Sequence, residues 1–454
     1  MTDHDDVKWD AIVVGSGMGG MAAAAALSRV GRRVLLLEQH WVLGGQTHSF
    51  SRDGFTWDVG IHYLSRVAPG ERDRKLIDWL SDTPIEFVPM GAVYDNLHIG
   101  SAKTLSLSRP YKAQEMDLKD RYPEEAEAIE AWIAALQSGR DALFKVLPTR
   151  AIPELAGGVM KWWNQRAITK WCGRTTEEVI ADITDNPELA AVFAAQWGVH
   201  GGRPSKASFA MHAMVGGSYL ECGAWYPVGG GAAFAEHIIP TIVKHGGETR
   251  TGVRVEGLLF EGEAVVGVRT EDGSEIRSDV VISDIGARET VDFLLPDSCG
   301  HEDWVEDIRA LSSSIAHFDL FLGFEGDIEA AGATRSNHWF YPTAEVDAVW
   351  TDAPDGTPPG MFVSFGSLKD PTHDPGPRQK HTGDVLVWTD WSTVAQWADT
   401  RFGARPDDYN EFKRRAEETI LAQFAAHFPN LAELVVLHEL STPLTTVSFT
   451  EHRK

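Results

Sequence analysis

The chain has 454 residues, of which 43% are hydrophobic and 24% are charged, a composition that suits a protein with a large buried core. At roughly 150 residues per domain, this length predicts two or three domains. Lys and Arg total 41, whereas Asp and Glu total 66, which gives a net charge of −25. Such an acidic chain is not expected to bind nucleic acid, because a phosphate backbone attracts basic surfaces.

The three cysteines include no C-x-x-C pair, so a disulfide framework and a zinc ribbon are excluded and no metal site is predicted. A reducing compartment is favoured. The acidic N-terminus lacks the order of a signal peptide, and no apolar run approaches the ~18 residues of a membrane span. We therefore expect a cytoplasmic protein that associates with a membrane peripherally at most.

The first forty residues predict a β-α-β unit. Residues 10–14 and 33–38 are short apolar runs typical of buried strands, and residues 18–30 form an alanine-rich segment that ends at Gly31, as a helix with a glycine stop would. Two buried strands joined by a helix indicate a parallel sheet with helices on its faces.

Further along the chain the apolar pattern changes twice. Residues 106–202 predict helices, and from Val253 the period shifts towards two. A three-stranded meander is predicted in residues 253–256, 264–268 and 275–282. Residues 352–383 are rich in Pro, Gly and Asp and predict a long surface loop or two.

A glycine motif, Gly15-Ser16-Gly17-Met18-Gly19-Gly20, separates the first predicted strand from its helix. In a G-x-G-x-x-G motif the first glycine permits a tight turn, the second lets a pyrophosphate approach the backbone, and the third lets helix and strand pack closely. The phosphates would then lie at a helix N-terminus, where N–H groups favour anions. The alternative is a glycine turn without a ligand.

Glu38 ends the second predicted strand, 23 residues after Gly15. Its carboxylate can bind both hydroxyls of an adenosine ribose and would repel a 2′-phosphate, which predicts FAD or NAD rather than NADP. A second glycine pair, Gly44-Gly45, would let another backbone segment approach the same pyrophosphate. A solvated glutamate is the alternative for Glu38.

Residues 13–20, Glu38, Gly44-Gly45 and Asp58-Val59-Gly60-Ile61-His62-Tyr63 resemble the phytoene desaturase-like flavoproteins, above all their branch of carotenoid isomerases and retinol saturases. Residues 226–230 (Tyr-Pro-Val-Gly-Gly) and 364–371 (Ser-Phe-Gly-Ser-Leu-Lys-Asp-Pro) are similar as well. The resemblance extends over nearly the whole chain. It implies FAD as the cofactor and a reaction at carbon–carbon double bonds of a long apolar isoprenoid, a retinoid or carotenoid, by saturation, desaturation or isomerisation.

The resemblance also implies an α/β fold in which a discontinuous, glutathione-reductase-like Rossmann domain binds FAD and an inserted α+β domain binds substrate. The FAD domain would comprise residues 1–105, 225–290 and 431–454, the last being the start of a truncated C-terminal segment. Residues 106–224 would form a helical insert that faces substrate or membrane. Residues 291–430 would form the rest of the substrate domain.

Individual residues acquire roles from the same resemblance. Gly45 and Gln46 would lie along the diphosphate and ribityl chain, and Val253 would contact the adenine through its backbone. His62 would lie near the flavin ring, where it could polarise substrate or shuttle a proton. A histidine merely packed under the flavin is the alternative. Because no second G-x-G-x-x-G unit is present, we expect an external electron donor or acceptor.

Residues 140–174 carry seven Lys and Arg against two acidic residues. Trp162, Trp163 and Trp171 are interleaved with these bases. Such a mixture suits the headgroup region of a membrane, where an insoluble polyene could enter. A packed helix whose long basic side chains reach the solvent is the alternative.

Two other functions stay open at this point. A flavin amine oxidase would share the N-terminal fingerprint, although residues 226–230 and 369–371 argue against it. A non-catalytic protein that binds or escorts isoprenoids could use the same scaffold.

Overall fold

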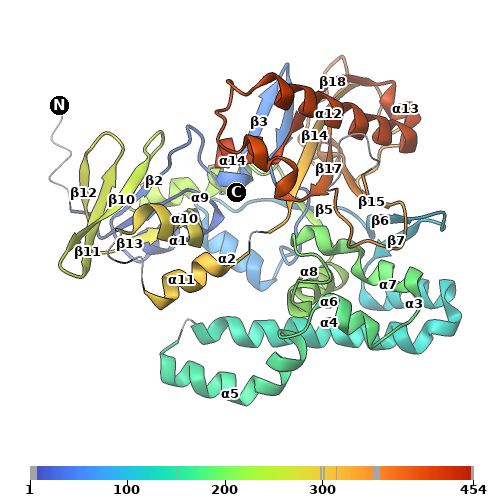
Figure 1. Ribbon diagram of the computed structural model, residues 1–454, viewed down its shortest axis with the longest axis horizontal. Coiled ribbons are helices and arrows are strands. Elements are labelled where there is room, and N and C mark those ends of the chain that lie inside the picture. Colours follow the sequence, from blue (N-terminus) through green and yellow to red (C-terminus); the bar gives the residue numbers. More distant parts are fainter. Residues whose placement is uncertain are drawn as a thin grey trace.

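A computed structural model of the chain describes residues 8–150, 152–296, 299, 302–312, 314–350 and 358–450. Two sheets organise these residues: a small parallel sheet and a larger mixed sheet, which lie on opposite sides of the view in Figure 1 above a layer of helices. The chain passes between the two sheets several times, so each part is assembled from distant segments.

The parallel sheet has four strands in the order β13-β1-β2-β9. Its strands are β1 (Ala11–Val14), β2 (Val34–Leu37), β9 (Glu248–Arg250) and β13 (Val281–Ser283). The helix α1 (Met18–Arg29) joins β1 to β2, as the sequence predicts.

Alternate residues of β1 and β2 pack on opposite faces of this sheet. Val13 and Leu36 share a core with α1 and α9 (Ala233–Lys244), whereas Ile12 and Leu35 share another with Val268 of an antiparallel meander. Both strands are therefore buried throughout, which explains their uninterrupted apolar runs.

The meander consists of β10 (Val255–Glu261), β11 (Ala264–Thr270) and β12 (Glu275–Arg277). The prediction of one strand over residues 275–282 was wrong. Its first part pairs with β11, but its apolar second part crosses to the parallel sheet as β13 and pairs with β1. The free edge of β1 needs a buried apolar partner, and residues 281–283 supply it.

The larger sheet has seven strands in the order β18-β14-β17-β16-β15-β6-β7, antiparallel except between β15 and β6. These are β6 (Val93–Ile99), β7 (Leu105–Ser108), β14 (Ala316–Glu325), β15 (Asn337–Tyr341), β16 (Met361–Ser364), β17 (Lys380–Thr389) and β18 (Val435–Ser441). One face packs against α12 (Asp407–His427) through Phe318, Phe412 and Phe424.

One prediction changes in this sheet. Residues 352–383 do not form surface loops alone: β16 lies within them and is fully buried, and β17 begins at Lys380, while residues 351–357 lie outside the described part. Within residues 431–454, whose assignment to the FAD domain stays a prediction, β18 pairs with β14. The following helix α14 (Pro443–Thr450) then places Phe449 edge-on against His40, 6.3 Å between ring centroids.

The helical layer confirms the prediction for residues 106–202. It comprises α3 (Tyr111–Arg121), α4 (Ala126–Val146), α5 (Glu154–Trp171), α6 (Thr176–Ala181), α7 (Pro187–Ala194) and α8 (Phe209–Cys222). Figure 1 shows α5 at the outer margin of this layer, farthest from the sheets. Among the helices of the described residues, none combines the length and the apolar character that crossing a membrane requires.

Short elements connect these layers. They are the β3–β4 hairpin (Ser49–Arg52 and Phe55–Asp58), α2 (Arg72–Leu80), the β5–β8 pair (Phe87–Pro89 and Trp225–Pro227), α10 (Ala287–Glu289), α11 (Asp303–Ala310) and α13 (Pro429–Ala432). The hairpin packs on the large sheet through Trp57 and Phe321. It thereby carries residues 58–63 into the space between the two sheets.

Candidate active site

The glycine motif lies at the carboxyl ends of β1 and β13, where the order of the parallel strands reverses. In open α/β sheets the crevice at such a switch point is the usual ligand site. Gly15 follows β1, and its amide donates a hydrogen bond of 2.8 Å to the carbonyl of Leu37. Asp284 follows β13, and its amide donates to the carbonyl of Val14, also at 2.8 Å.

Two glycine segments meet directly at this point. A Cβ on Gly20 would collide with the carbonyl oxygen of Gly15, and a Cβ on Gly45 would lie 3.0 Å from the Cα of Gly17. Gly44 has a φ of 116°, and its amide donates to the hydroxyl of Ser16 at 3.1 Å. The second glycine pair therefore lies against the first loop, because neither segment carries a side chain there.

Glu38 is fixed at the edge of the same loop. Its Oε2 accepts hydrogen bonds from the Ser16 amide at 2.9 Å and the Ser16 hydroxyl at 2.6 Å, and its Oε1 accepts from the His40 amide at 2.8 Å. The Val253 amide donates to the Glu38 carbonyl at 2.9 Å. The structure thus brings Ser16, Glu38 and Val253 together from distant segments.

The start of α1 fits a bound anion. The Gly20 amide donates to Oδ2 of Asp284 at 2.6 Å, which shows that this N-terminus already holds a carboxylate. Free N–H groups at a helix N-terminus favour a phosphate. With Glu38 beside them, these residues fit the diphosphate and ribose of a dinucleotide. The carboxylate of Asp284 lies against Gly17 and Gly19, so it has to turn away for a diphosphate to reach the amides.

A cavity of about 750 Å³ extends from His40, Trp41 and Gln46, in the segment of the second glycine pair, to the large sheet. This volume is typical of sites for small molecules and cofactors. Gln46 and His62 both line it, so two residues selected from the sequence face one cavity. Most of its remaining wall is aromatic and aliphatic, including Trp339, Phe362 and Trp388.

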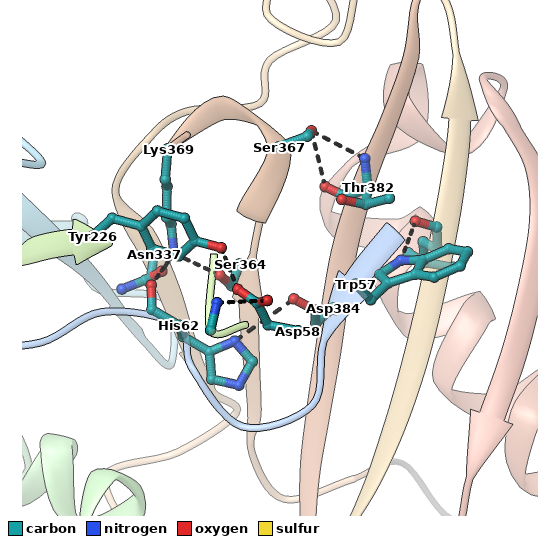
Figure 2. Close-up of polar contacts among 12 residues, drawn as sticks. Trp57, Asp58, His62, Tyr226, Asn337, Ser364, Ser367, Lys369, Thr382 and Asp384 are labelled. Atoms are coloured by element: carbon teal, nitrogen blue, oxygen red, sulfur yellow. Dashed lines mark hydrogen bonds and ion pairs between the residues drawn. The ribbon is translucent and has the colours of Figure 1, made fainter. Parts of the chain in front are cut away.

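His62 lies where the cavity meets the large sheet (Figure 2). Its Nδ1 is 3.6 Å from Oδ2 of Asp384, and its ring packs edge-on against Phe362 at 5.2 Å between centroids. Its carbonyl accepts a hydrogen bond of 2.8 Å from Nζ of Lys369. The position of His62 in the cavity wall is therefore fixed through both side chain and backbone, while its catalytic role stays a prediction.

Lys369 is only 2% exposed and lies behind this wall. Besides the His62 carbonyl, its Nζ donates to Oδ1 of Asn337 at 2.5 Å and to the hydroxyl of Ser364 at 2.6 Å. Burial lowers the pKa of Lys369 to about 7, although the nearby carboxyl of Asp384 favours the charged form. The sequence contains Lys369 in a motif but gives no sign that it supports the His62 loop.

Asp58 joins two motifs that are far apart in the sequence. Its carboxyl accepts hydrogen bonds from the Ser49 hydroxyl at 2.7 Å, the Gly231 amide at 2.8 Å and the hydroxyl of Tyr226. Burial raises the pKa of Asp58, and these hydrogen bonds oppose that rise. Residues 58–63 and 226–231 consequently form one polar framework beside the cavity.

Three polar residues near the cavity were missed in the sequence: His317 and Asp319 on β14, and Asp384 on β17. On β14 they alternate with Phe318 and Leu320, the pattern of a strand with one face in solvent. Both faces of β14 are in fact covered, and His317 and Asp319 line the cavity. Only the unusual placement of charged residues within apolar runs could have singled them out.

A family model described as flavin containing amine oxidoreductase matches residues 18–375. The chain belongs to this family. The all-trans-retinol 13,14-reductase of Danio rerio is 29% identical over 458 residues, which span 96% of this chain and 75% of that protein. The chloroplastic prolycopene isomerase of Daucus carota is 25% identical over 457 residues, which span 96% and 70%. Cyclohexylamine oxidase from Brevibacterium oxydans has a similar structure, with a TM-score of 0.59 at 16% identity over 96% of this chain and 85% of that one.

These findings confirm several predictions. The protein is an FAD-dependent oxidoreductase, and its fold combines a Rossmann-type FAD-binding part with a substrate-binding part. The resemblance to carotenoid isomerases and retinol saturases is confirmed by relatives of both names. Membership of an enzyme family argues against the non-catalytic escort protein.

Proposed function

We propose that the protein uses FAD to act on carbon–carbon double bonds of a long, apolar isoprenoid, a retinoid or a carotenoid. The observation that carries this proposal is the cavity of about 750 Å³, which begins beside Gln46 and whose wall is largely aromatic and aliphatic. A polyene is flat, apolar and polarisable, so aromatic walls suit it. The relatives named for retinol and prolycopene support the same substrate class.

The residues expected to hold FAD lie in the two glycine segments and beside them, and residues 15–20, Glu38 and residues 44–46 are here called the glycine cradle. The loop Gly15, Ser16, Gly17, Gly19 and Gly20 would bind the diphosphate with its amides, and Glu38 would bind the adenosine ribose. Gly45 and Gln46 would follow the diphosphate and ribityl chain, and the Val253 backbone would contact the adenine. When bound, FAD supplies electron-pair transfer through its ring, chemistry that no amino-acid side chain provides.

The chain's own contribution is positioning, exclusion of water and control of one proton. Trp339 and Trp388 close the cavity on the side of the large sheet. The carboxylate of Asp384 beside Nδ1 of His62 favours a proton on that nitrogen, which leaves Nε2 to accept or supply one. A donor or acceptor that binds transiently would complete the electron balance.

The test begins with the absorbance spectrum of the purified chain, in which bound FAD gives a peak near ~450 nm. The flavin is then reduced without oxygen, and the protein is incubated with all-trans-retinol or with prolycopene. We expect a saturated or isomerised product by chromatography. Hydrogen peroxide release with amines, combined with no change in either polyene, would favour a flavin amine oxidase instead.

We further propose that α5 contacts a membrane surface. Leu155, Trp162 and Trp163 are 89%, 74% and 78% exposed, which is unusual for such large apolar side chains. Lys161 and Lys170 lie on the same helix and would attract anionic headgroups. An insoluble substrate could then pass from the lipid to the protein without crossing water.

A further inference from the structure

A polar cluster lies at the cavity wall on the large sheet. His317 and Asp319 lie on β14, and Asp384 lies on the neighbouring strand β17. Asp319 pairs with Leu386, whereas Asp384 pairs with Phe321, which lies two residues further along β14. Because residues two apart on a strand point to the same face, the two carboxyl groups share one face of the sheet and are diagonal neighbours. That face is the one on which His317 and Asp319 line the cavity.

Both carboxyl groups are buried, and within the described part of the chain each has one oxygen without a hydrogen-bond donor. Asp319 is 2% and Asp384 is 5% exposed, and Oδ1 of each has no hydrogen-bond partner among the described residues. Other buried carboxyl groups differ: that of Asp95, for example, accepts from Tyr63, Gln196 and Asn337. Buried polar groups are normally satisfied, so an orphaned acceptor on a cavity wall is an unused binding group.

The protonation of the cluster indicates what it can bind. Burial, together with the neighbouring Asp384, raises the pKa of Asp319, which favours a neutral carboxylic acid. Burial also lowers the pKa of His317 to about 4 and keeps its ring neutral. A neutral carboxylic acid both donates and accepts a hydrogen bond, and so does a hydroxyl group.

We propose that Asp319, with Asp384 behind it and His317 beside it, binds the hydroxyl group at the end of an isoprenoid alcohol. The aromatic wall formed by Trp339, Phe362 and Trp388 would hold the apolar chain, so the ligand is amphipathic rather than a pure hydrocarbon. This inference rests on the proposed function and narrows its substrate class.

The test measures binding of three ligands that share one polyene chain: all-trans-retinol, its hydrocarbon counterpart axerophthene, and retinylamine. The flavin-loaded protein is titrated, and quenching of tryptophan fluorescence gives each Kd, because Trp339 and Trp388 line the cavity. We expect retinol to bind about tenfold more tightly than axerophthene, since one hydrogen bond to a buried acid is satisfied. Retinylamine should not bind more tightly than retinol.

Two variants locate the effect. Asp319→Leu should remove the preference for retinol, whereas Asp319→Asn should retain most of it, because an amide still donates and accepts. Glu325→Leu is the matched control: it removes a carboxylate from the same strand, where Glu325 pairs with Arg378 at 2.8 Å. If Asp319→Leu does not fold, the Kd values of the three ligands for the wild type and Asp319→Asn still show whether the hydroxyl group is bound.

The outcomes separate the two proposals. Equal affinity for retinol and axerophthene, unchanged in Asp319→Leu, would overturn the hydroxyl subsite and leave the isoprenoid function in place. Tighter binding of retinylamine than of retinol would mean that the cluster binds an ammonium group rather than a hydroxyl group. Failure to bind any of the polyenes would overturn the proposed function itself.

Discussion

The glycine cradle and the wall of the large sheet both contain buried carboxyl groups, but they treat them in opposite ways. At the cradle, both oxygens of Glu38 accept hydrogen bonds from residues of the same loops. On the sheet, Asp319 and Asp384 each keep an oxygen without a partner. The Glu38 carboxylate is thus held in place before a ligand arrives, whereas the two carboxyl groups of the sheet still have acceptors that a ligand can use.

This difference shows how recognition is divided within the molecule. A cofactor that stays bound is served by rigid backbone groups whose geometry local sequence defines. A substrate that enters and leaves meets an apolar wall with few polar groups, which select by their position. Changes at four places test this contrast: the glycine cradle, Lys369, Asp319 and α5.

The largest effect is expected at the cradle. In Gly20→Ala, the new Cβ would meet the carbonyl oxygen of Gly15, and neither backbone can move without opening the loop. We expect the variant to lose FAD during purification, measured as loss of the flavin absorbance. Gly158→Ala is the control, since nothing lies within 4 Å of its Cβ position, and it should stay yellow. A yellow Gly20→Ala protein would contradict the assigned cradle.

The next effect concerns Lys369. Lys369→Met leaves Asn337, Ser364 and the His62 carbonyl without their donor, and we expect a loss of about 3 kcal/mol in the free energy of unfolding. Denaturation in urea measures it. The exposed Lys244→Met, which removes a surface pair with Asp82, should change stability by less than about 1 kcal/mol.

The same variant gives a pH dependence. Since the pKa of Lys369 is about 7 in the folded protein and about 10.5 in an unfolded chain, the unfolded state holds more protons between these values. The wild type should therefore gain stability relative to Lys369→Met as the pH rises from 7 to 9. Parallel stability curves would contradict the burial of this amine.

A smaller effect is expected for Asp319, and it makes the free energy of unfolding fall rather than rise with pH. Its pKa is raised in the folded state, so the wild type loses stability as the pH rises above about 4, where the unfolded group ionises. Asp319→Asn removes this titration and should be more stable than the wild type at pH 8 by about 1 kcal/mol. Thermal unfolding at pH 5 and pH 8 measures the gap, which should shrink at the lower pH.

The smallest effect on stability is expected on α5. Changing both Trp162 and Trp163 to Ser should alter stability by no more than about 0.5 kcal/mol, because both side chains are exposed. Sedimentation with anionic vesicles should nevertheless fall. Neutralising Lys161, Arg166 and Lys170 together should weaken sedimentation as well, and unchanged binding in both variants would mean that α5 is ordinary surface.

Much of the cradle could be predicted because its determinants are local. The alternation of strand, glycine loop and helix over residues 10–38 defines β1, α1 and β2, and the glycines show where another backbone must approach. Glu38 and Gln46 follow within a few residues. The role of Val253 at the adenine came from the family resemblance and stays a prediction, while its amide donates a hydrogen bond to the Glu38 carbonyl.

The large sheet could not be predicted in the same way. β18 pairs with β14 and β15 pairs with β6, so its polar residues meet only after segments from residue 93 to residue 441 are assembled. The division of residues 275–282 between two sheets has the same origin, since the missing partner of β1 is distant in the chain.

The dinucleotide-binding loop and the order of its strands and helix could be predicted from the chain alone, because glycine sterics and strand-to-helix spacing act within a few residues. The flavoprotein class followed from the resemblance of the motifs. The support of His62 by Lys369, and the buried face shared by Asp319 and Asp384, follow only from the assembled fold. Burial and cross-strand register are properties of the assembled sheet. They turned an alternating pattern that resembles a solvent-facing strand into the polar part of a cavity wall.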